Sequence, residues 1–226
     1  MRISFISDTH GKHREIDLEK DLPGGDLLIH AGDFMNSGKH EYELTDFLDW
    51  FNSLDNYRYK VFIAGNHDVI FENNPARVKE ILSNYARVYY LQDNWVGIVH
   101  NNAKVKVYGS PWQPTFFNWA FNLDRGGDKL RGVWSKIPID TDILITHTPP
   151  QGILDTSGSP YFEPNLGCEL LKERVDKYPP RLHVFGHIHG SCGYRCTDNT
   201  CFFNASLLSE QYEYTNIPIH IDWNPK

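Results

Sequence analysis

The apolar positions in the first third of the chain predict strands joined by helical connections. Apolar runs at residues 2–7, 26–30 and 59–64 each lead into a polar loop, as buried strands do. Residues 41–54 instead carry apolar side chains at helical spacing with acidic residues opposite, which indicates an amphipathic helix before the third strand. Strands separated by such connections indicate parallel βαβ units in one sheet.

The pattern changes beyond Pro75, which is predicted to open a helix that runs to about residue 85. Short apolar runs separated by polar turns follow, and we expect them to form a meander that builds a second sheet. These runs lie at residues 88–91, 95–100 and 104–108. The remaining chain predicts helices at 124–135 and 165–177 and strands at 142–146, 182–185, 200–204 and 217–221. Without a repeat or linker, residues 1–226 are predicted to form one domain.

Residues of the kinds that bind metals follow five of the predicted strands. The carboxyl ends of parallel strands meet at one edge of a sheet, where α/β proteins place their chemistry. Singly, each residue has a structural alternative, such as helix capping by Asp8, and His30, inside a strand, is expected to be a core residue. Together they predict a metal centre. The strand-end residues are Asp8, His10, Asp33, Asn66, His67, His147, His187 and His189.

The donor set indicates two ions rather than one. Carboxylate, amide and imidazole ligands without thiolate suit Mn²⁺, Fe²⁺ or Zn²⁺. One carboxylate shared by two ions about 3.5–4 Å apart allows them to hold a hydroxide of lowered pKa. Such a pair suits phosphoryl transfer, in which an acid on the opposite side protonates the leaving oxygen.

Aromatic residues and prolines crowd the loop at residues 109–121. This loop is either a platform on which a base or another ring stacks, or a rigid hydrophobic plug. Trp112 and Gln113, flanked by prolines, are our candidates for substrate contact. A second loop, rich in glycine and serine at residues 151–164, is expected to form a rim of the site.

Charge and cysteine content limit which binding partners and which cellular compartment we expect for this protein. The net charge is -7, from 22 Lys and Arg against 29 Asp and Glu, which argues against binding to extended nucleic acid. No signal peptide and no bilayer-spanning apolar run are visible, so we expect a cytoplasmic protein without membrane contact, of open oligomeric state. Cys168 and the cluster Cys192, Cys196 and Cys201 are expected to be reduced thiols, with a disulfide or a zinc site as alternatives.

The strand-end motifs occur in an order that resembles the calcineurin-like metallophosphoesterases. The resemblance rests on Asp8-X-His10, Gly32-Asp33, Gly65-Asn66-His67-Asp68, His147 and Gly186-His187-X-His189, which span most of the chain. Within that superfamily, residues 109–114, 119–121 and 145–150 look like the metallophosphoesterase-domain-containing subgroup, whose members act as phosphodiesterases, including on cyclic nucleotides. The resemblance implies a four-layer α/β/β/α sandwich of two mixed sheets flanked by helices.

The resemblance also implies roles for the strand-end residues. One divalent ion would take Asp8, His10 and His189, the other would take Asn66, His147 and His187, and Asp33 would bridge them. His67 would contact the phosphate, together with Asn66, and act as general acid. Asp68 would support His67 in catalysis, although as a helix cap or hydrogen-bond anchor it could be purely structural.

One departure from the superfamily bears on the substrate. Its protein phosphatases carry Gly-Asp-X-Val-Asp-Arg-Gly, whose Arg grips a phosphomonoester dianion, whereas here Asn36 replaces the second Asp and Ser37 replaces the Arg. Without that clamp a doubly charged monoester loses bidentate recognition. We therefore expect a metal-dependent phosphodiesterase acting on small diesters, with cyclic nucleotides as leading candidates. The alternatives are a phosphomonoesterase or nuclease at the same site, or a non-catalytic scaffold.

Overall fold

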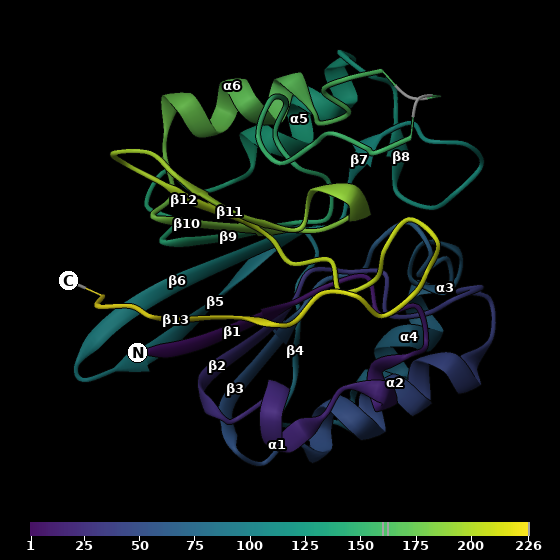
Figure 1. Cartoon of the computed structure of the whole chain (residues 1–226), viewed down its shortest axis with the longest axis vertical. Helices are drawn as coiled ribbons and strands as arrows, with labels where there is room; N and C mark the ends of the chain where they lie inside the picture. Colours follow the sequence, from purple (N-terminus) through teal and green to yellow (C-terminus); the bar gives the residue numbers. More distant parts are fainter. Residues whose placement is uncertain (160, 162, 226) are drawn as a thin grey trace.

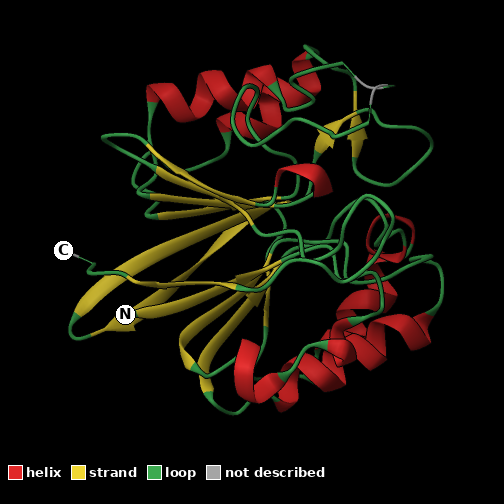
Figure 2. Cartoon of the chain, in the orientation of Figure 1, coloured by secondary structure: helices red, strands yellow, loops and turns green. Residues whose placement is uncertain are grey.

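Two β-sheets face each other between two groups of helices (Figure 1). The computed structural model describes residues 1–159, 161 and 163–225. Helices α2 (Glu41–Ser53) and α4 (Pro75–Leu82) cover the outside of one sheet, and α5 (Asp128–Ser135) and α6 (Glu169–Lys177) cover the outside of the other. The secondary-structure colouring shows the same helix, sheet, sheet, helix order of layers (Figure 2). The expected four-layer α/β/β/α sandwich is confirmed.

The first sheet is mostly parallel, as the βαβ pattern predicts. Its order is β13 (Ile219–Asp222), β1 (Arg2–Ile6), β2 (Gly25–His30), β3 (Tyr57–Phe62) and β4 (Tyr89–Tyr90). Only β13 runs antiparallel, beside β1. The assignment of residues 88–91 to the second sheet is wrong, because β4 pairs in parallel with β3 through Val61 and Tyr89.

The expected meander is confirmed in part, because residues 94–110 form an antiparallel hairpin in the second sheet, but the centre of that sheet is parallel. Its order is β11 (Gly193–Cys196), β12 (Cys201–Asn204), β10 (Leu182–Phe185), β9 (Ile143–Thr146), β6 (Ala103–Ser110) and β5 (Asn94–His100). Strands β6, β9, β10 and β12 are parallel, and only the edge strands β5 and β11 are antiparallel to their neighbours. The reason is that the chain leaves β6 through a long connection containing α5 and returns to β9 in the same direction. The carboxyl ends of both parallel sets therefore lie on the same side of the molecule (Figure 2).

The helices follow the apolar pattern more closely in the first half than in the second. Helix α2 buries the predicted face, including Leu44, Phe47 and Phe51. Helix α5 begins at Asp128 and α6 at Glu169, each four residues later than expected from the sequence. Short elements complete the chain: η1 (His13–Glu15), α1 (Leu18–Asp21), α3 (Ile70–Asn73), η2 (His189–Ser191) and the paired strands β7 (Gln113–Pro114) and β8 (Asn122–Leu123). None of the helices in the described part of the chain has the length and apolarity needed to cross a bilayer.

A core between the two sheets fixes their relative position. Phe5 and Val61 of the first sheet share one buried cluster with Val107, Ile145 and Val184 of the second. All five side chains are fully buried. Because the strand ends are anchored in this shared core, the loops that leave the two sheets are held against each other.

The expectation of reduced thiols is wrong for two of the four cysteines. Cys196 and Cys201 form a disulfide, because they face each other in the antiparallel pairing of β11 with β12. Strand β11 was not predicted from the sequence, so this pairing was not visible there. Cys168 and Cys192 are free thiols.

Candidate metal centre

Strained turns at the strand ends aim the candidate ligands at one point. Asp8, His10, Asp33 and His187 have φ values of 54°, 41°, 56° and 67°, in the left-handed region that L-residues avoid. Each such residue costs about 1–3 kcal/mol and persists where the surrounding structure enforces it. Four such residues at neighbouring strand ends indicate a site built for function rather than a set of ordinary turns.

One cluster comprises Asp8, His10 and His189, whose candidate ligand atoms lie within 4.8 Å of one another. The His189 Nε2 atom is 3.2 Å from Asp8 Oδ1 and 3.3 Å from His10 Nε2. Asp8 also accepts hydrogen bonds from the His187 N–H and the Ser206 hydroxyl, which fix its carboxylate. His189 donates its Nδ1–H to the Ser209 carbonyl oxygen at 2.8 Å, which leaves the Nε2 lone pair directed at the cluster.

A second cluster comprises Asp33, His147 and His187, with the Asn66 amide beside it. His147 Nε2 lies 3.2 Å from Asp33 Oδ2 and 3.0 Å from Asn66 Oδ1. Asp33 Oδ2 is also 3.9 Å from His10 Nε2. The carboxylate of Asp33 thus lies between the two clusters, in the position that a shared ligand would need.

The protonation of these groups fits a role as metal ligands. Burial lowers the pKa of His10 to about 4 and that of His187 to about 3, which keeps both imidazoles neutral. For His147, burial acts in the opposite sense to the charge of Asp33, which raises the pKa to about 9. His147 donates Nδ1–H to the Ala31 carbonyl oxygen, so its Nε2 lone pair faces two acceptor oxygens unless a proton or a cation lies between them. A divalent cation satisfies all three atoms at once.

Glycines leave room for the ligands where any side chain would collide. A Cβ atom added at Gly186 would lie 2.0 Å from Asp8 Oδ2, and one at Gly65 would lie 2.3 Å from Asp33 Oδ1. At Gly32 the nearest atom would be His147 Nδ1 at 2.7 Å. The donor set, the neutral imidazoles of His10 and His187 and this close backbone packing fit divalent metal ions.

The imidazole of His67 is held by a main-chain carbonyl group rather than by a carboxylate. Its Nδ1–H donates to the Asn36 carbonyl oxygen at 2.8 Å, and its N–H donates to Asp33 Oδ1 at 2.7 Å. Asp68 does not contact the imidazole through any described hydrogen bond. Its buried carboxylate instead accepts from the N–H groups of Gly65, Asp33 and Met35, which joins two strand-end loops. Burial and the charge of Asp33 raise the pKa of Asp68, while the N–H donors act in the other direction.

The aromatic loop reaches the site through residues other than those we predicted. Gln113 is fully buried and donates to Asn122 Oδ1, and Trp112 donates its Nε1–H to Asp93. Neither side chain lines the pocket at the metal ligands. Instead, Trp119 stacks on the His67 ring at 3.9 Å, and Phe116 lies edge-on to His187 at 5.3 Å.

The Asn122 side chain holds these two rings in place. Its Nδ2 group lies 3.0–3.3 Å from the carbonyl oxygens of Phe116, Phe117 and Trp119, and its Oδ1 accepts from the Phe116 N–H. The Ala120 N–H also donates to the Asn66 carbonyl oxygen. The loop is therefore a fixed wall of the site, and its two rings cover histidines.

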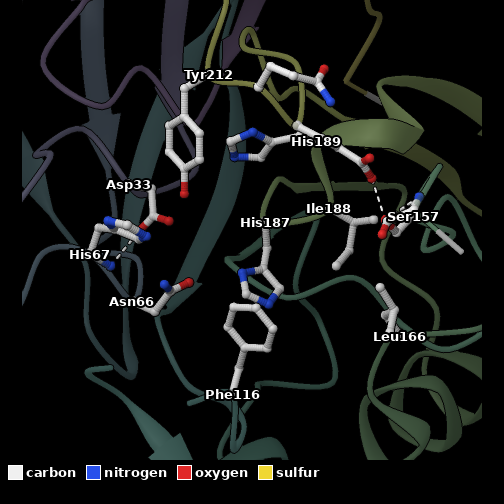
Figure 3. Close-up of a pocket in the computed structure, with 13 residues that line it drawn as sticks. Asp33, Asn66, His67, Phe116, Ser157, Leu166, His187, Ile188, His189 and Tyr212 are labelled. Atoms are coloured by element: carbon white, nitrogen blue, oxygen red, sulfur yellow. Dashed lines mark hydrogen bonds between the residues drawn. The ribbon is translucent and has the colours of Figure 1, made fainter. Parts of the chain in front are cut away.

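A pocket of about 360 Å³ opens beside the two clusters (Figure 3). Ser157 and Ser159 of the expected rim line it, together with Leu166, whereas residues 160 and 162 of that rim lie outside the described residues. Residues 210–212 also line the pocket, and Glu210 accepts a hydrogen bond from the Ser157 hydroxyl. This segment was not predicted as part of the site because it carries no motif. The pocket is lined by Asp33, Asn66, His67, Phe116, Ser157, Ser159, Leu166, His187, Ile188, His189, Glu210, Gln211 and Tyr212.

The fold and the two clusters together define a metallophosphoesterase. Residues 1–191 match the model of the calcineurin-like phosphoesterase family. The human and mouse proteins named Metallophosphoesterase domain-containing protein 1 are each 40% identical to this chain over 98% of its length and 70% of theirs. The chain therefore belongs to the calcineurin-like phosphoesterase family, whose members typically depend on divalent metal ions.

Solved structures of low sequence identity support the fold. The structure of the phosphopantetheinyl hydrolase of Mycobacterium tuberculosis superimposes with a TM-score of 0.61 over 93% of this chain and 90% of the other, at 15% identity. At that identity the likeness concerns the fold and not the substrate.

Proposed function

We propose that the protein is a dinuclear metal-dependent phosphodiesterase that hydrolyses small phosphodiesters, with cyclic nucleotides as the leading substrate class. The two clusters support this assignment by their composition and by the position of Asp33 between them. In this proposal Asp8, His10 and His189 hold one ion, Asn66, His147 and His187 hold the other, and Asp33 bridges them. Two divalent ions held there would supply a water of lowered pKa and neutralise charge on the phosphoryl oxygens.

We infer a diester substrate rather than a monoester because no cationic side chain is found among the described residues of the pocket wall. Among the described residues that line the pocket there is no Lys or Arg. Ser37, at the position of the phosphatase Arg, donates its hydroxyl to Glu43, which also accepts from the N–H groups of Asn36 and Ser37. A monoester dianion would lack a bidentate partner here, whereas a diester carries one charge less.

His67 is the candidate general acid. It lies in the pocket wall with its Nδ1–H bound to the Asn36 carbonyl oxygen, which leaves Nε2 to hold and deliver a proton. Trp119 covers one face of the ring and limits its rotation. Trp112 and Gln113 remain substrate-contact candidates only through a rearrangement of the loop that holds them. Asp68 acts as a positioning residue because it ties the loop of His67 to the loop of Asp33.

The proposal is tested by comparing hydrolysis of bis-p-nitrophenyl phosphate and p-nitrophenyl phosphate after chelation and return of Mn²⁺. We expect activity on the diester that returns with metal and falls about a thousandfold in Asp33→Asn, which removes the charge between the clusters. His67→Ala should lower kcat while metal content stays unchanged. Asp140→Asn, an exposed carboxylate paired with Lys106, is the matched control and should retain full activity.

Other outcomes separate the alternatives. A preference for the monoester would contradict the interpretation of the missing Arg and indicate a phosphomonoesterase. Cleavage of polynucleotides in preference to small diesters would indicate a nuclease. Full metal occupancy without turnover of any phosphoester would favour the non-catalytic scaffold.

A further inference from the structure

The Tyr212 ring lies beside the cluster of Asp8, His10 and His189 and near His67, the candidate general acid. Its ring centroid lies 4.7 Å from that of His10, 5.3 Å from that of His189 and 6.3 Å from that of His67, at steep interplanar angles. Tilted and edge-to-face contacts at these distances are favourable between aromatic rings and restrain the Tyr212 ring. Tyr212 therefore lies at the site although it belongs to none of the strand-end motifs in the sequence.

The hydroxyl end of Tyr212 points into the pocket toward Asp33 (Figure 3). Within residues 1–159, 161 and 163–225 the hydroxyl has no hydrogen-bond partner. Tyr212 is 40% exposed and lines the pocket, so its hydroxyl faces the open pocket and is free to donate where a substrate would bind.

The backbone around Tyr212 is built to hold this position. Its φ is 60°, a left-handed value that is unusual for a bulky residue. The Tyr212 N–H donates to the Ser209 carbonyl oxygen, which also accepts from His189 Nδ1, and the Lys12 ammonium donates to the Tyr212 carbonyl oxygen. Strain that is maintained at a candidate site by several contacts favours a functional placement.

We propose that Tyr212 is a substrate-binding residue whose hydroxyl donates a hydrogen bond to a non-bridging oxygen of the phosphodiester. This inference rests on the proposed function of the site. The Tyr212 hydroxyl would be the group that binds the anion, because the described residues that line the pocket include no Lys or Arg. A neutral donor contributes one directional hydrogen bond and no charge, which suits a monoanionic diester better than a dianion.

The test is Tyr212→Phe, which keeps the ring on His10 and His189 and removes only the hydroxyl. The kcat/KM for bis-p-nitrophenyl phosphate should fall about 10- to 100-fold, the effect of one hydrogen bond to a charged group. The Kd for dimethyl phosphate, an unreactive diester, should rise about tenfold when measured by calorimetry on the metal-loaded protein. Tyr194→Phe, which removes an exposed hydroxyl on β11, is the control and should change neither value.

The two measurements separate failure of this inference from failure of the proposed function. If wild type hydrolyses the diester and Tyr212→Phe matches it within twofold in both assays, the role of the hydroxyl is refuted and the phosphodiesterase stands. If wild type is inactive on diesters, the proposed function is refuted. A tenfold weaker binding of dimethyl phosphate by Tyr212→Phe would then still establish the contact.

Discussion

The strand-end loops and the two rim segments, residues 116–122 and 209–213, hold side chains of the candidate site by different means. In the strand-end loops the main chain itself sets the position, as in the left-handed turn at Asp8 and the three N–H groups gathered by Asp68. In the rim segments, rings reach across to histidines from outside, as Trp119 does to His67, and only Tyr212 among the described rings that face the pocket combines this with a left-handed main chain. The strand-end loops therefore tolerate little change, whereas a rim contact can be removed without dismantling the clusters.

The largest effect is expected from adding one methyl group in a strand-end loop. In Gly186→Ala the new Cβ would lie 2.0 Å from Asp8 Oδ2 and 2.2 Å from Ser7 Oγ, so the carboxylate must move. We expect the free energy of unfolding to fall by about 1–3 kcal/mol, the usual cost of overpacking, together with a loss of bound metal. Denaturant unfolding and metal analysis of the purified protein measure the two changes.

Gly132→Ala is the matched control for that substitution. Gly132 is an exposed position in α5 with nothing within 4 Å of an added Cβ. The same methyl group should raise stability there by about 0.5–1 kcal/mol, because alanine is the better helix former. Equal stability and metal content in Gly186→Ala and wild type would contradict the conclusion that the strand-end turns have no room for an added methyl group.

The same difference explains which parts of the molecule could be predicted from sequence. A strand followed by a ligand residue is a local pattern, so Asp33 and His147 could be located at strand ends without knowledge of the partners. The parallel first sheet and helix α2 follow from equally local periodicity.

Features that depend on distant partners were missed or misplaced. Strand β4 is two residues long, and its sheet is decided by its pairing with β3 rather than by its own sequence. The disulfide of Cys196 and Cys201 depends on the unpredicted strand β11. Trp112 and Trp119 are similar residues in one loop, but Trp112 is bound to Asp93, whereas Asn122 binds the main chain of Trp119, which faces the site.

A smaller effect is expected from removing a ring of the rim. In Trp119→Leu the stack on His67 is lost while the described ligands of both clusters remain. Aromatic pairs of this kind contribute about 0.5–1.5 kcal/mol, so kcat on the diester should fall by a few-fold to about tenfold, with little change in KM or metal content. Trp119→Phe should restore most of the activity because a ring remains over the imidazole.

Phe117→Leu is the control for the loop itself. Phe117 is 72% exposed and lies between Phe116 and Trp119 in the sequence, with its ring centroid 4.6 Å from that of Phe116. Its replacement should leave the kinetics of the diester reaction unchanged. An equal loss of kcat in Phe117→Leu and Trp119→Leu would mean that general disturbance of the loop, and not the stack on His67, causes the effect.

The smallest expected effect concerns a single missing charge at a strand-end loop. Ser37→Arg would place a guanidinium at the position of the phosphatase Arg, but Glu43, which binds Ser37 at present, would pair with it. The informative variant is therefore Ser37→Arg combined with Glu43→Gln, compared with Glu43→Gln alone. We expect the ratio of p-nitrophenyl phosphate to bis-p-nitrophenyl phosphate hydrolysis to rise a few-fold, because a guanidinium forms paired hydrogen bonds with a dianion.

Ser135→Arg is the control, because it makes the same change of charge at an exposed position of α5, and it should leave the ratio unchanged. An unchanged ratio in the double variant would show that the pocket wall beyond Ser37, including the rim segments, determines the preference between diester and monoester.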